Sequence, residues 1–200
     1  MMTALILAAG ESRRMGRDKA LLTYHGRTFL ETIIAHLRAA GIEKITAVLG
    51  HHAEIIQRTV NLEAVRVVIN PEYARGQTSS LQCGLAAVAE DAPEAVILCL
   101  VDHPAISTEV MRKLKERFES TRATVLIPTC EGRRGHPVVI RRTLFPQLLT
   151  LNPEEPANTL IRQYRDATEF VEVADPGILL DVDDPGDYER LMESGSPGTK

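Results

Sequence analysis

Aromatic residues are scarce in this 200-residue chain, and tryptophan is absent. Phe and Tyr together make up 4% of the residues, so the chain has few of the side chains on which single-stranded nucleic acids stack. Basic residues are not in excess either, because 23 Lys and Arg stand against 27 Asp and Glu, a formal charge of −4 at pH 7. We therefore expect no nucleic-acid partner.

Cysteines and long apolar runs are also few. Cys83, Cys99 and Cys130 are widely spaced and form no C-x-x-C pair, which predicts reduced thiols rather than a disulfide framework or a thiolate zinc site. No apolar run reaches the roughly 18 residues needed to cross a bilayer. A secretory signal has a basic segment before its apolar run, and no such segment precedes the first apolar run here. These absences predict a cytoplasmic protein without a membrane partner.

Short apolar runs alternate with amphipathic segments along most of the chain. Such runs are typical of strands buried on both faces, and they lie at Thr3–Leu7, Lys44–Leu49, Val65–Ile69, Ala95–Leu100 and Thr124–Ile127. The amphipathic segments predict helices at Thr28–Ala40, Ser79–Ala89 and Thr108–Ser120. The alternation predicts an α/β fold with a doubly wound, mostly parallel sheet in three α/β/α layers. We expect one domain, residues 1–194, and a flexible tail, residues 195–200.

Beyond residue 128 the alternation is less regular. We expect a polar turn into a short strand, two helical stretches, an extended segment, and a last helix that starts at a proline. In chain order these are Cys130–Gly135, Pro137–Ile140, Thr143–Thr150, Pro156–Arg165, Glu169–Val173 and Pro185–Glu193.

The loop after the first strand combines small residues with positive charge. Ligands of doubly wound sheets bind beyond the carboxyl ends of the strands, which is where this loop lies. Its small residues let a ligand approach the backbone, and its Arg and Lys side chains suit a polyphosphate. Neither G-x-x-x-x-G-K-[ST] nor G-x-G-x-x-G is present, so the loop is not a P-loop, and a Rossmann oxidoreductase is disfavoured.

Five motifs in order resemble those of a known family. They are LAAGESRRMGRDK (residues 7–19), GQTSSLQCGL (76–85), VDHP (101–104), GHPV (135–138) and DVDDPGD (181–187). They are similar to motifs of nucleotidyltransferases that attach a nucleoside monophosphate to a phosphorylated partner. The branch with molybdenum cofactor cytidylyltransferase and its guanylyltransferase relative is the most similar. The resemblance implies the Rossmann-like fold of the nucleotide-diphospho-sugar transferases.

The implied reaction transfers CMP from CTP to molybdopterin and releases pyrophosphate. Ala-Ala-Gly in the first loop, where Ala-Gly-Gly would indicate the guanylyl branch, favours CTP, because the Cβ of Ala9 narrows the space beside the base. The resemblance also suggests a molybdenum hydroxylase apoenzyme as a partner. A sugar- or polyol-phosphate nucleotidyltransferase and a non-catalytic cofactor-handover protein remain alternatives. The segment Glu155–Ile161 departs from the sequence of the relatives, which leaves the acceptor open.

The resemblance also assigns residues. Lys19, Arg14 and Asp102 are the implied catalytic residues, and Asp102 and Asp183 the implied ligands of Mg²⁺ or Mn²⁺. The nucleotide-binding positions are Leu7, Ala8, Ala9, Gly10, Arg14, Lys19, Gln77, Ser79 and Ser80. His136 and Arg134 are the implied acceptor-binding residues.

Several residues have a structural interpretation as well. Ser79 or Ser80 could cap the helix that they begin, and Asp184 or Asp187 could cap the last helix. Four arginines lie near His136 in the sequence: Arg133, Arg134, Arg141 and Arg142. Because side chains alternate along a strand, we expect half of them to face an acceptor. His51 and His52 could be a metal-binding pair, but adjacent side chains diverge on a helix or a strand. We therefore expect a loop that starts a helix, with proximity to the nucleotide base as the alternative.

Overall fold

The computed structural model describes residues 1–194, and the predicted tail, residues 195–200, lies outside the described residues. The division into a domain and a tail stays a prediction. The strands of the main sheet are β1 (Met2–Ala8), β4 (Ile45–Leu49), β5 (Val65–Ile69), β6 (Ala95–Leu100), β7 (Val125–Cys130), β8 (Arg133–Arg134), β9 (Val138–Arg141) and β10 (Thr168–Glu172). Their order is β10-β7-β9-β6-β1-β4-β5, and β8 pairs with β7.

The main sheet is mostly parallel, as predicted. β1 lies parallel to both β4 and β6, and β5 and β10 extend the sheet with further parallel pairs. β9 runs antiparallel between β6 and β7. The carboxyl ends of β1, β4, β6 and β7 therefore meet at one edge of the sheet, and the loop that enters β9 joins them there.

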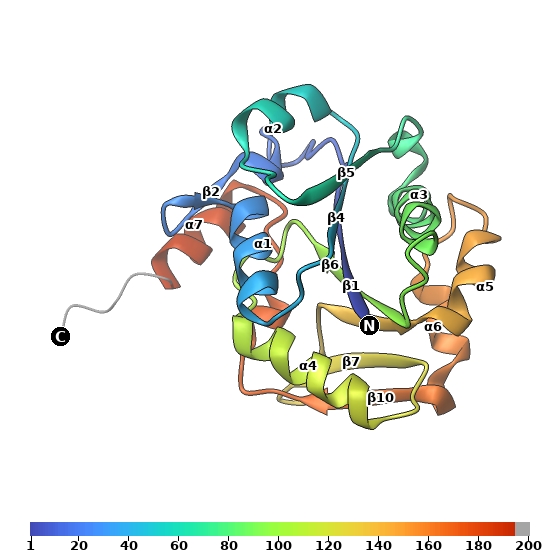
Figure 1. Ribbon diagram of the computed structural model, residues 1–200. Coiled ribbons are helices and arrows are strands. Elements are labelled where there is room, and N and C mark those ends of the chain that lie inside the picture. The colour runs from blue at the N-terminus through green and yellow to red at the C-terminus, as the bar shows by residue number, and fades with distance from the viewer. Residues whose placement is uncertain (195–200) are drawn as a thin grey trace.

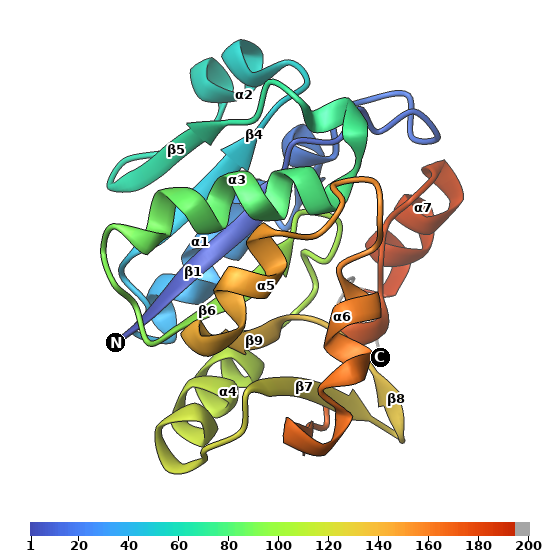
Figure 2. The ribbon, with the colours of Figure 1, turned by 90° about the vertical axis from the view of Figure 1, so that its right-hand side faces the viewer.

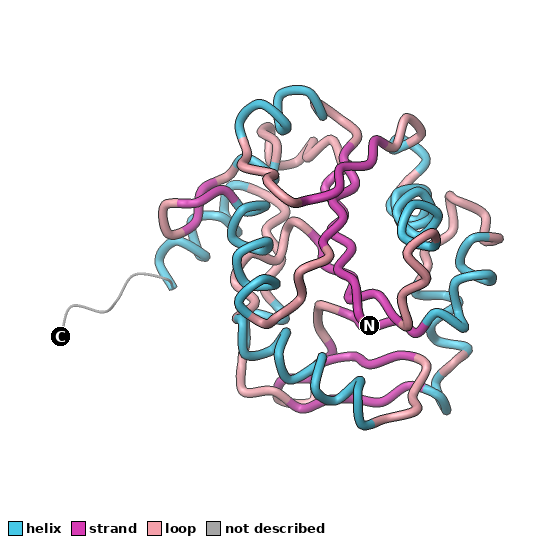
Figure 3. The backbone as a smooth tube through the Cα atoms, viewed as in Figure 1, coloured by secondary structure: helices cyan, strands magenta, loops and turns pink. Residues whose placement is uncertain are grey.

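Helices cover both faces of the main sheet (Figures 1 and 3). They are α1 (Phe29–Ala39), α2 (Ala53–Thr59), α3 (Gln77–Ala89), α4 (Thr108–Ser120), α5 (Phe145–Leu149), α6 (Asn158–Gln163) and α7 (Pro185–Ser194). α1 and α4 lie side by side on one face, and α3, α5 and α6 lie on the other, which faces the viewer in Figure 2. The three-layer α/β/α prediction is confirmed. Within the described residues, no helix has the length and apolar character of a membrane span.

Alternation along β1 divides the core between the two faces. Ala4 and Ile6 pack in the cluster that α1 and α4 cover, whereas Leu5 and Leu7 pack in the cluster that α3 covers. All four side chains are buried, as the continuous apolar run predicts for a central strand. β1 is thereby held firmly on both sides, and the loop that follows it starts from a fixed point.

Local sequence explains where α1 begins and ends. The side chain of Thr28 accepts a hydrogen bond from the Glu31 amide, and the Glu31 carboxylate accepts one from the Thr28 amide, which together form a capping box. Gly41, with φ of 73°, follows the helix in the left-handed conformation that favours glycine.

The structure differs from the sequence-based expectations in several elements. β7 continues to Cys130, three residues beyond the predicted end, and β8 lies within the predicted polar turn. Val65–Ile69 is a strand, but as the edge of the sheet it is only partly buried, and Ile69 is 46% exposed. α3 begins at Gln77, two residues before the predicted start. A small hairpin of β2 (Thr23–Tyr24) and β3 (Arg27–Thr28) was not predicted. Its turn residues, His25 and Gly26, both adopt positive φ, as a tight hairpin turn requires.

Gly84 lets α3 pack closely on the sheet. A Cβ at this position would lie 2.4 Å from Leu5 Cδ1 and 2.8 Å from Val48 Cγ2, both in the buried core. The second glycine of the GQTSSLQCGL motif is thus explained by packing, and it sets the distance between α3 and β1, the strand that precedes the first loop.

Replacing Gly84 should therefore destabilise the fold by overpacking. Gly84→Val should lower the free energy of unfolding by about 1–3 kcal/mol. Ala86→Val introduces the same residue at an exposed position of α3, and it should cost only the helix propensity of valine, up to about 0.7 kcal/mol. Urea unfolding followed by circular dichroism measures both, and equal effects would contradict this account of Gly84.

Candidate active site

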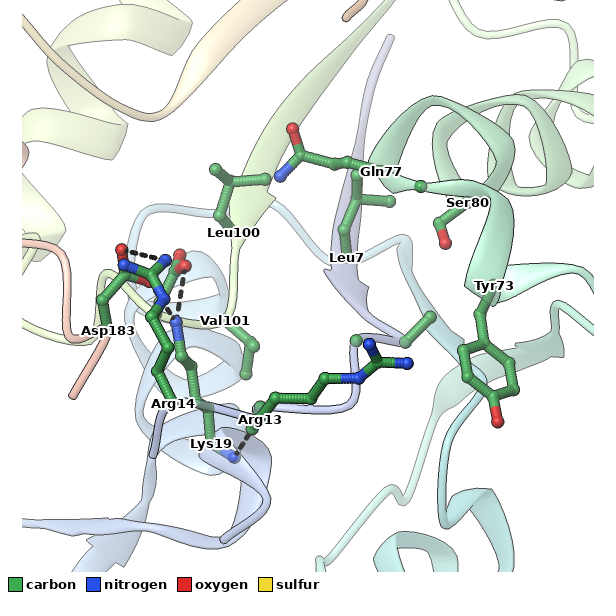
Figure 4. A pocket seen from close by; sticks show the side chains of 15 residues that line it. Leu7, Arg13, Arg14, Lys19, Tyr73, Gln77, Ser80, Leu100, Val101 and Asp183 are labelled. Carbon is green, nitrogen blue, oxygen red and sulfur yellow. Dashed lines mark hydrogen bonds and ion pairs between the residues drawn. The ribbon is translucent and has the colours of Figure 1, made fainter. Parts of the chain in front are cut away.

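A cleft of about 320 Å³ lies at the carboxyl ends of β1 and β6 and at the start of α3. Its lining consists of Leu7, Ala9, Gly10, Ser12, Arg13, Arg14, Lys19, Tyr73, Gly76, Gln77, Ser80, Leu100, Val101, Asp102 and Asp183. In Figure 4, Lys19, Arg14 and Asp183 gather on one side of the cleft, whereas Gln77, Ser80 and Tyr73 lie on the opposite side. Most of the residues that the resemblance assigns to nucleotide binding and catalysis therefore share one cavity.

Lys19 is shared between the two carboxylates that the resemblance assigns to a metal. Its Nζ lies 3.2 Å from Asp102 Oδ2 and 2.6 Å from Asp183 Oδ1. The side chain of Lys19 is 13% exposed, so this ion-pair network is shielded from solvent. Arg14 Nη2 adds a contact of 2.7 Å to Asp183 Oδ2, although Arg14 itself is exposed. The Lys19 ammonium and then Arg14 hold the pKa of Asp183 below its usual range.

Backbone contacts hold Asp183 beside Asp102. The Val182 amide donates to the Asp102 carbonyl at 2.9 Å, so the segment before α7 is tied to the end of β6. Val182 is buried in a small apolar cluster with Met15, Phe29 and Leu191. A residue late in the chain is thus fixed at the edge of the sheet where the first loop lies.

Two other aspartates of this acidic segment cap α7. Asp184 Oδ1 accepts from the Asp187 amide at 2.9 Å, and Asp187 Oδ2 accepts from the Asp184 amide at 3.1 Å. The capping interpretation of Asp184 and Asp187 is confirmed, and Asp183 remains as the carboxylate of the segment that faces the cleft.

The carboxylates fit a divalent ion. Asp102 Oδ1 is buried and has no hydrogen-bond partner among the described residues, and His103 Nε2, at 3.8 Å, is too far away to supply one. Asp183 lies close enough to share the same ammonium with Asp102. One or two carboxylates with room for phosphate oxygens and water is the donor set that Mg²⁺ prefers.

The first loop is folded around Ser12. Its carbonyl accepts from the amides of Met15 and Gly16, and its Oγ accepts from the Lys19 amide at 3.1 Å. Ser12 and Gly16 have positive φ of 51° and 71°. Met15, at 5% exposure, anchors the loop in the apolar cluster of Val182. The loop is therefore turned back so that Lys19 reaches the carboxylates.

The two serines at the start of α3 have different environments. Ser80 lines the cleft, whereas the Ser79 hydroxyl donates to the carbonyls of Gly76 and Glu72 and is buried. Asn70, buried directly after β5, donates to both hydroxyls at 3.0 Å. Gly76, with φ of 114°, is the N-cap residue, so the interpretation of Ser79 or Ser80 as the cap is wrong: the helix begins earlier.

A second, larger cavity of about 610 Å³ adjoins the cleft, and Gln77 lines both. His136 and Arg134 line it, and the Arg134 guanidinium lies 4.5 Å from the ring centroid of Phe170. Its other lining residues include Arg162, Arg165, Leu98, Ile127, Val138, Pro156, Ala157, Asn158 and Ile161. The segment that departs from the relatives thus forms one wall of this cavity.

Fewer arginines near His136 face the cavity than expected. Among the described side chains, Arg134 alone of the four lines it. Arg141 instead donates to the carbonyls of Ala123 and Thr121 and stacks on Phe118. Arg141 pairs with Ala95 at the end of β9 that lies away from His136, which keeps it out of the cavity. Arg162 and Arg165, in and just after α6, bring cations that the sequence analysis did not assign.

His136 is neutral at physiological pH. Its ring centroid lies 4.9 Å from that of His103, and the Nδ1 atoms of both rings are buried without a partner among the residues described. Burial, and then the neighbouring His103, lower the pKa of His136 to about 4, and burial also lowers the pKa of His103. Any positive charge offered to an acceptor therefore comes from the arginines.

His51 and His52 are not among the residues that line the cleft of Lys19. They line a third hollow together with Asp18, Arg17 and Tyr188. The expected loop that starts a helix is confirmed, since α2 begins at Ala53. The expectation that the adjacent rings diverge is wrong: His52 has a left-handed backbone with φ of 49°, which brings the two ring centroids to 3.7 Å.

The sequence analysis assigned no role to Tyr73 and Asn70, and it counted Arg13 only among the positive charges of the first loop. Arg13 and Tyr73 line the cleft, and Asn70 orders the second loop behind it. The position of Asn70 directly after a predicted strand was a usable signal, because polar residues at carboxyl ends of parallel strands face the ligand edge. Ala8 and Ser79 are the predicted nucleotide positions that do not appear among the cleft-lining residues described.

Comparison with known families decides the class. A family described as the MobA-like NTP transferase domain matches residues 4–168. The chain belongs to this family. The nicotine blue oxidoreductase of Paenarthrobacter nicotinovorans is 32% identical over 95% of this chain and 96% of its own length. The molybdenum cofactor cytidylyltransferase of Escherichia coli K12 is 28% identical over 94% of each chain.

Solved structures agree with the family. Rv0371c from Mycobacterium tuberculosis H37Rv superposes with a TM-score of 0.82 at 29% identity, covering 96% of this chain and 97% of that one. The same protein has been solved as a complex with manganese. The predicted fold is confirmed, and the chain is a nucleotidyltransferase of the MobA-like family.

The low pKa of His136 predicts a loss of stability in mild acid. Unfolded His136 takes up a proton near pH 6.5, whereas the folded residue resists protonation until about pH 4. The unfolded state therefore binds more protons in this window, and the free energy of unfolding falls as the pH drops through it, by about 2 kcal/mol between pH 7.5 and pH 5.0. Urea unfolding at pH 7.5 and 5.0 measures the fall. His136→Gln should reduce it.

The matched control is His25→Asn, which replaces an exposed histidine at the β2–β3 turn with a residue that tolerates positive φ. The expectation fails if His136→Gln and His25→Asn keep the same difference in unfolding free energy between the two pH values.

Proposed function

We propose that the chain is a cytoplasmic cytidylyltransferase that transfers CMP from CTP to molybdopterin. The transfer chemistry is supported by one observation above all: the ammonium of Lys19 contacts the carboxylates of both Asp102 and Asp183, and all three residues line the cleft. The choice of CTP and molybdopterin rests on the molybdenum cofactor cytidylyltransferase relative and on Ala9 in the cleft wall. A molybdenum hydroxylase apoenzyme would then receive the product.

The reaction requires little general base. A phosphate oxygen of the acceptor, already anionic near pH 7, attacks the α-phosphorus of CTP. The bond from the α-phosphorus to the oxygen that bridges to the β-phosphate breaks, and pyrophosphate leaves with the electron pair. Catalysis then depends on alignment and on neutralising the negative charge that moves to the leaving group.

Lys19 and Arg14 are suited to that charge. In the structure described, both are ion-paired with Asp183, and Lys19 also with Asp102. A Mg²⁺ or Mn²⁺ ion held by Asp102 and Asp183 would polarise phosphate oxygens. The two cationic side chains would then be available to the triphosphate, Arg14 as a planar fork and Lys19 as a point charge.

The second cavity is the proposed acceptor site. It shares Gln77 with the nucleotide cleft, so an acceptor there can present a phosphate to the α-phosphorus. Apolar side chains of Leu98, Ile127 and Phe170 suit a flat ring system. Arg134, with Arg162 on α6 and Arg165 just after that helix, suits an anionic group.

Removing the Lys19 charge tests the catalytic role. Lys19→Met keeps the length of the side chain and should lower kcat/KM for pyrophosphate release by roughly 100- to 1,000-fold, as the loss of a preorganised charge-stabilising donor typically does. Lys44→Met removes an exposed lysine that pairs with Asp91 and should leave the rate unchanged. Equal rates for the two variants in a coupled pyrophosphate assay would exclude Lys19 from catalysis.

The choice of nucleotide is tested by calorimetry. With Mg²⁺ present, CTP should bind more tightly than GTP, ATP or UTP, and binding should weaken without the ion. Ala9→Gly removes the Cβ beside the base and should reduce the preference for CTP over GTP by about tenfold, the effect of one small group in a pocket. Equal affinity for GTP and CTP in the wild type would contradict the assignment.

The acceptor is tested by turnover. Molybdopterin, sugar phosphates and polyol phosphates are each supplied with CTP and Mg²⁺, and the cytidylylated product is identified by mass spectrometry. A product with molybdopterin supports the proposal. Products with sugar or polyol phosphates alone would move the assignment to that branch, and tight CTP binding without any product would favour a cofactor-handover protein.

A redox function is the second candidate, because the relative at 32% identity is named as an oxidoreductase. A cavity with Phe170 and apolar neighbours could hold an aromatic substrate, but electron transfer gives no role to the ion-paired carboxylates of Asp102 and Asp183. Oxidation of a reduced nicotinamide nucleotide by an aromatic dye, unaffected by Asp102→Asn, would establish this function instead.

A further inference from the structure

The third hollow brings together three metal-ligating side chains that the proposed transfer reaction does not use. Asp18, His51 and His52 each offer one ligand atom, and these atoms lie within 4.8 Å of one another. The hollow, of about 570 Å³, lies beside the first loop, and its lining includes neither Asp102 nor Asp183. We propose that these three residues form a separate site for a transition-metal ion of the Zn²⁺ type.

The donor set suits such an ion. Two imidazoles and one carboxylate, with a further position open, match three-ligand zinc sites, whereas Mg²⁺ prefers oxygen ligands alone. His52 Nδ1 lies 3.0 Å from Asp18 Oδ2. Two ligands of one tetrahedral zinc ion, with bonds of about 2.0–2.1 Å, stand roughly 3.3 Å apart, so this pair needs only a small shift.

The backbone holds the two histidines together. The left-handed conformation of His52 turns its ring onto that of His51. A Cβ at Gly50 would lie 2.8 Å from the Ala9 carbonyl oxygen and 2.7 Å from Tyr73 Cβ, so only glycine fits at this position. This close passage lets the His51 amide donate to the Ala9 carbonyl at 3.1 Å.

A hydrogen bond also orients the His51 ring. Its Nδ1 lies 3.3 Å from the Tyr73 hydroxyl, which leaves Nε2 as the second donor atom. Metal-binding histidines are commonly oriented in this way by a partner on the other ring nitrogen. Tyr73 itself lines the nucleotide cleft, so the proposed metal site and the nucleotide cleft share a wall.

Charges of both signs surround the site, because Arg13 and Arg17 line the same hollow, but the Asp18 carboxylate is the charged group that lies among the ligand atoms. Asp18 supplies a carboxylate that is 14% exposed and paired with His52 alone among its described contacts. Glu11 lines the same hollow, and its pKa is lowered, first by its hydrogen bond to Arg13. Because Asp18 precedes Lys19 directly and His51 is bonded to Ala9, an ion here would join both ends of the first loop to the start of α2.

Cobalt spectroscopy on tag-free, chelator-treated protein tests the site. We expect one Co²⁺ to bind with intense visible ligand-field bands, and Zn²⁺ but not Mg²⁺ to displace it. His52→Asn keeps a residue that tolerates positive φ and should weaken Co²⁺ binding at least about 100-fold, more than the loss of an outer-shell partner does. Asp18→Asn should weaken it as well. His25→Asn, at another exposed histidine with positive φ, should bind as the wild type does.

Two further measurements separate the alternatives. Asp102→Asn should keep the visible bands, and their loss in that variant but not in His52→Asn would place the ion in the nucleotide cleft and overturn the proposal. Zn²⁺ should raise the Tm of the wild type but not of His52→Asn, whose circular dichroism without metal should match the wild type. A wild type without intense bands would equally overturn it.

Discussion

The active site depends on one partly buried ammonium. Lys19 is ion-paired with Asp102, which is 83 residues away in sequence, and with Asp183, which is 164 residues away. Two carboxylates held this close would repel each other strongly if no cation lay between them. Lys19 thus stabilises the cleft by holding two carboxylates together in the structure described, and in the proposed reaction the same charge would also bind a triphosphate.

The remaining architecture serves to bring these three residues together. β1, buried on both faces, fixes where the first loop starts, and Met15 and Ser12 turn that loop back toward the sheet. The Val182 amide ties the last segment to the end of β6, and the Asp184–Asp187 cap begins α7 immediately beyond it. The antiparallel strand β9 places His136 and the second cavity at the same edge. The mostly parallel sheet thus gathers at one edge residues that lie far apart in the sequence.

The fold could be read from the sequence because its signals are local and periodic. The apolar run of β6 and the amphipathic pattern of α4 predicted both elements with their ends. Burial of β5 could not be predicted, because an edge strand and a central strand can carry similar apolar runs. Lys19, Asp102 and Asp183 were assigned by motif resemblance. The proximity of His51, His52 and Asp18 was not predicted. It depends on the left-handed backbone of His52 and on the close approach of the chain at Gly50, and neither follows from hydrophobic periodicity.

A crystal structure with CTP and Mg²⁺ tests the central claim most directly. The account predicts an ion held by Asp102 and Asp183, the triphosphate on Lys19 and Arg14, and the base beside Ala9. It also predicts that Lys19 has moved from the carboxylates toward phosphate oxygens. The account would be contradicted by a nucleotide in another hollow, or by bound CTP with Lys19 still paired with both carboxylates and no ion between them.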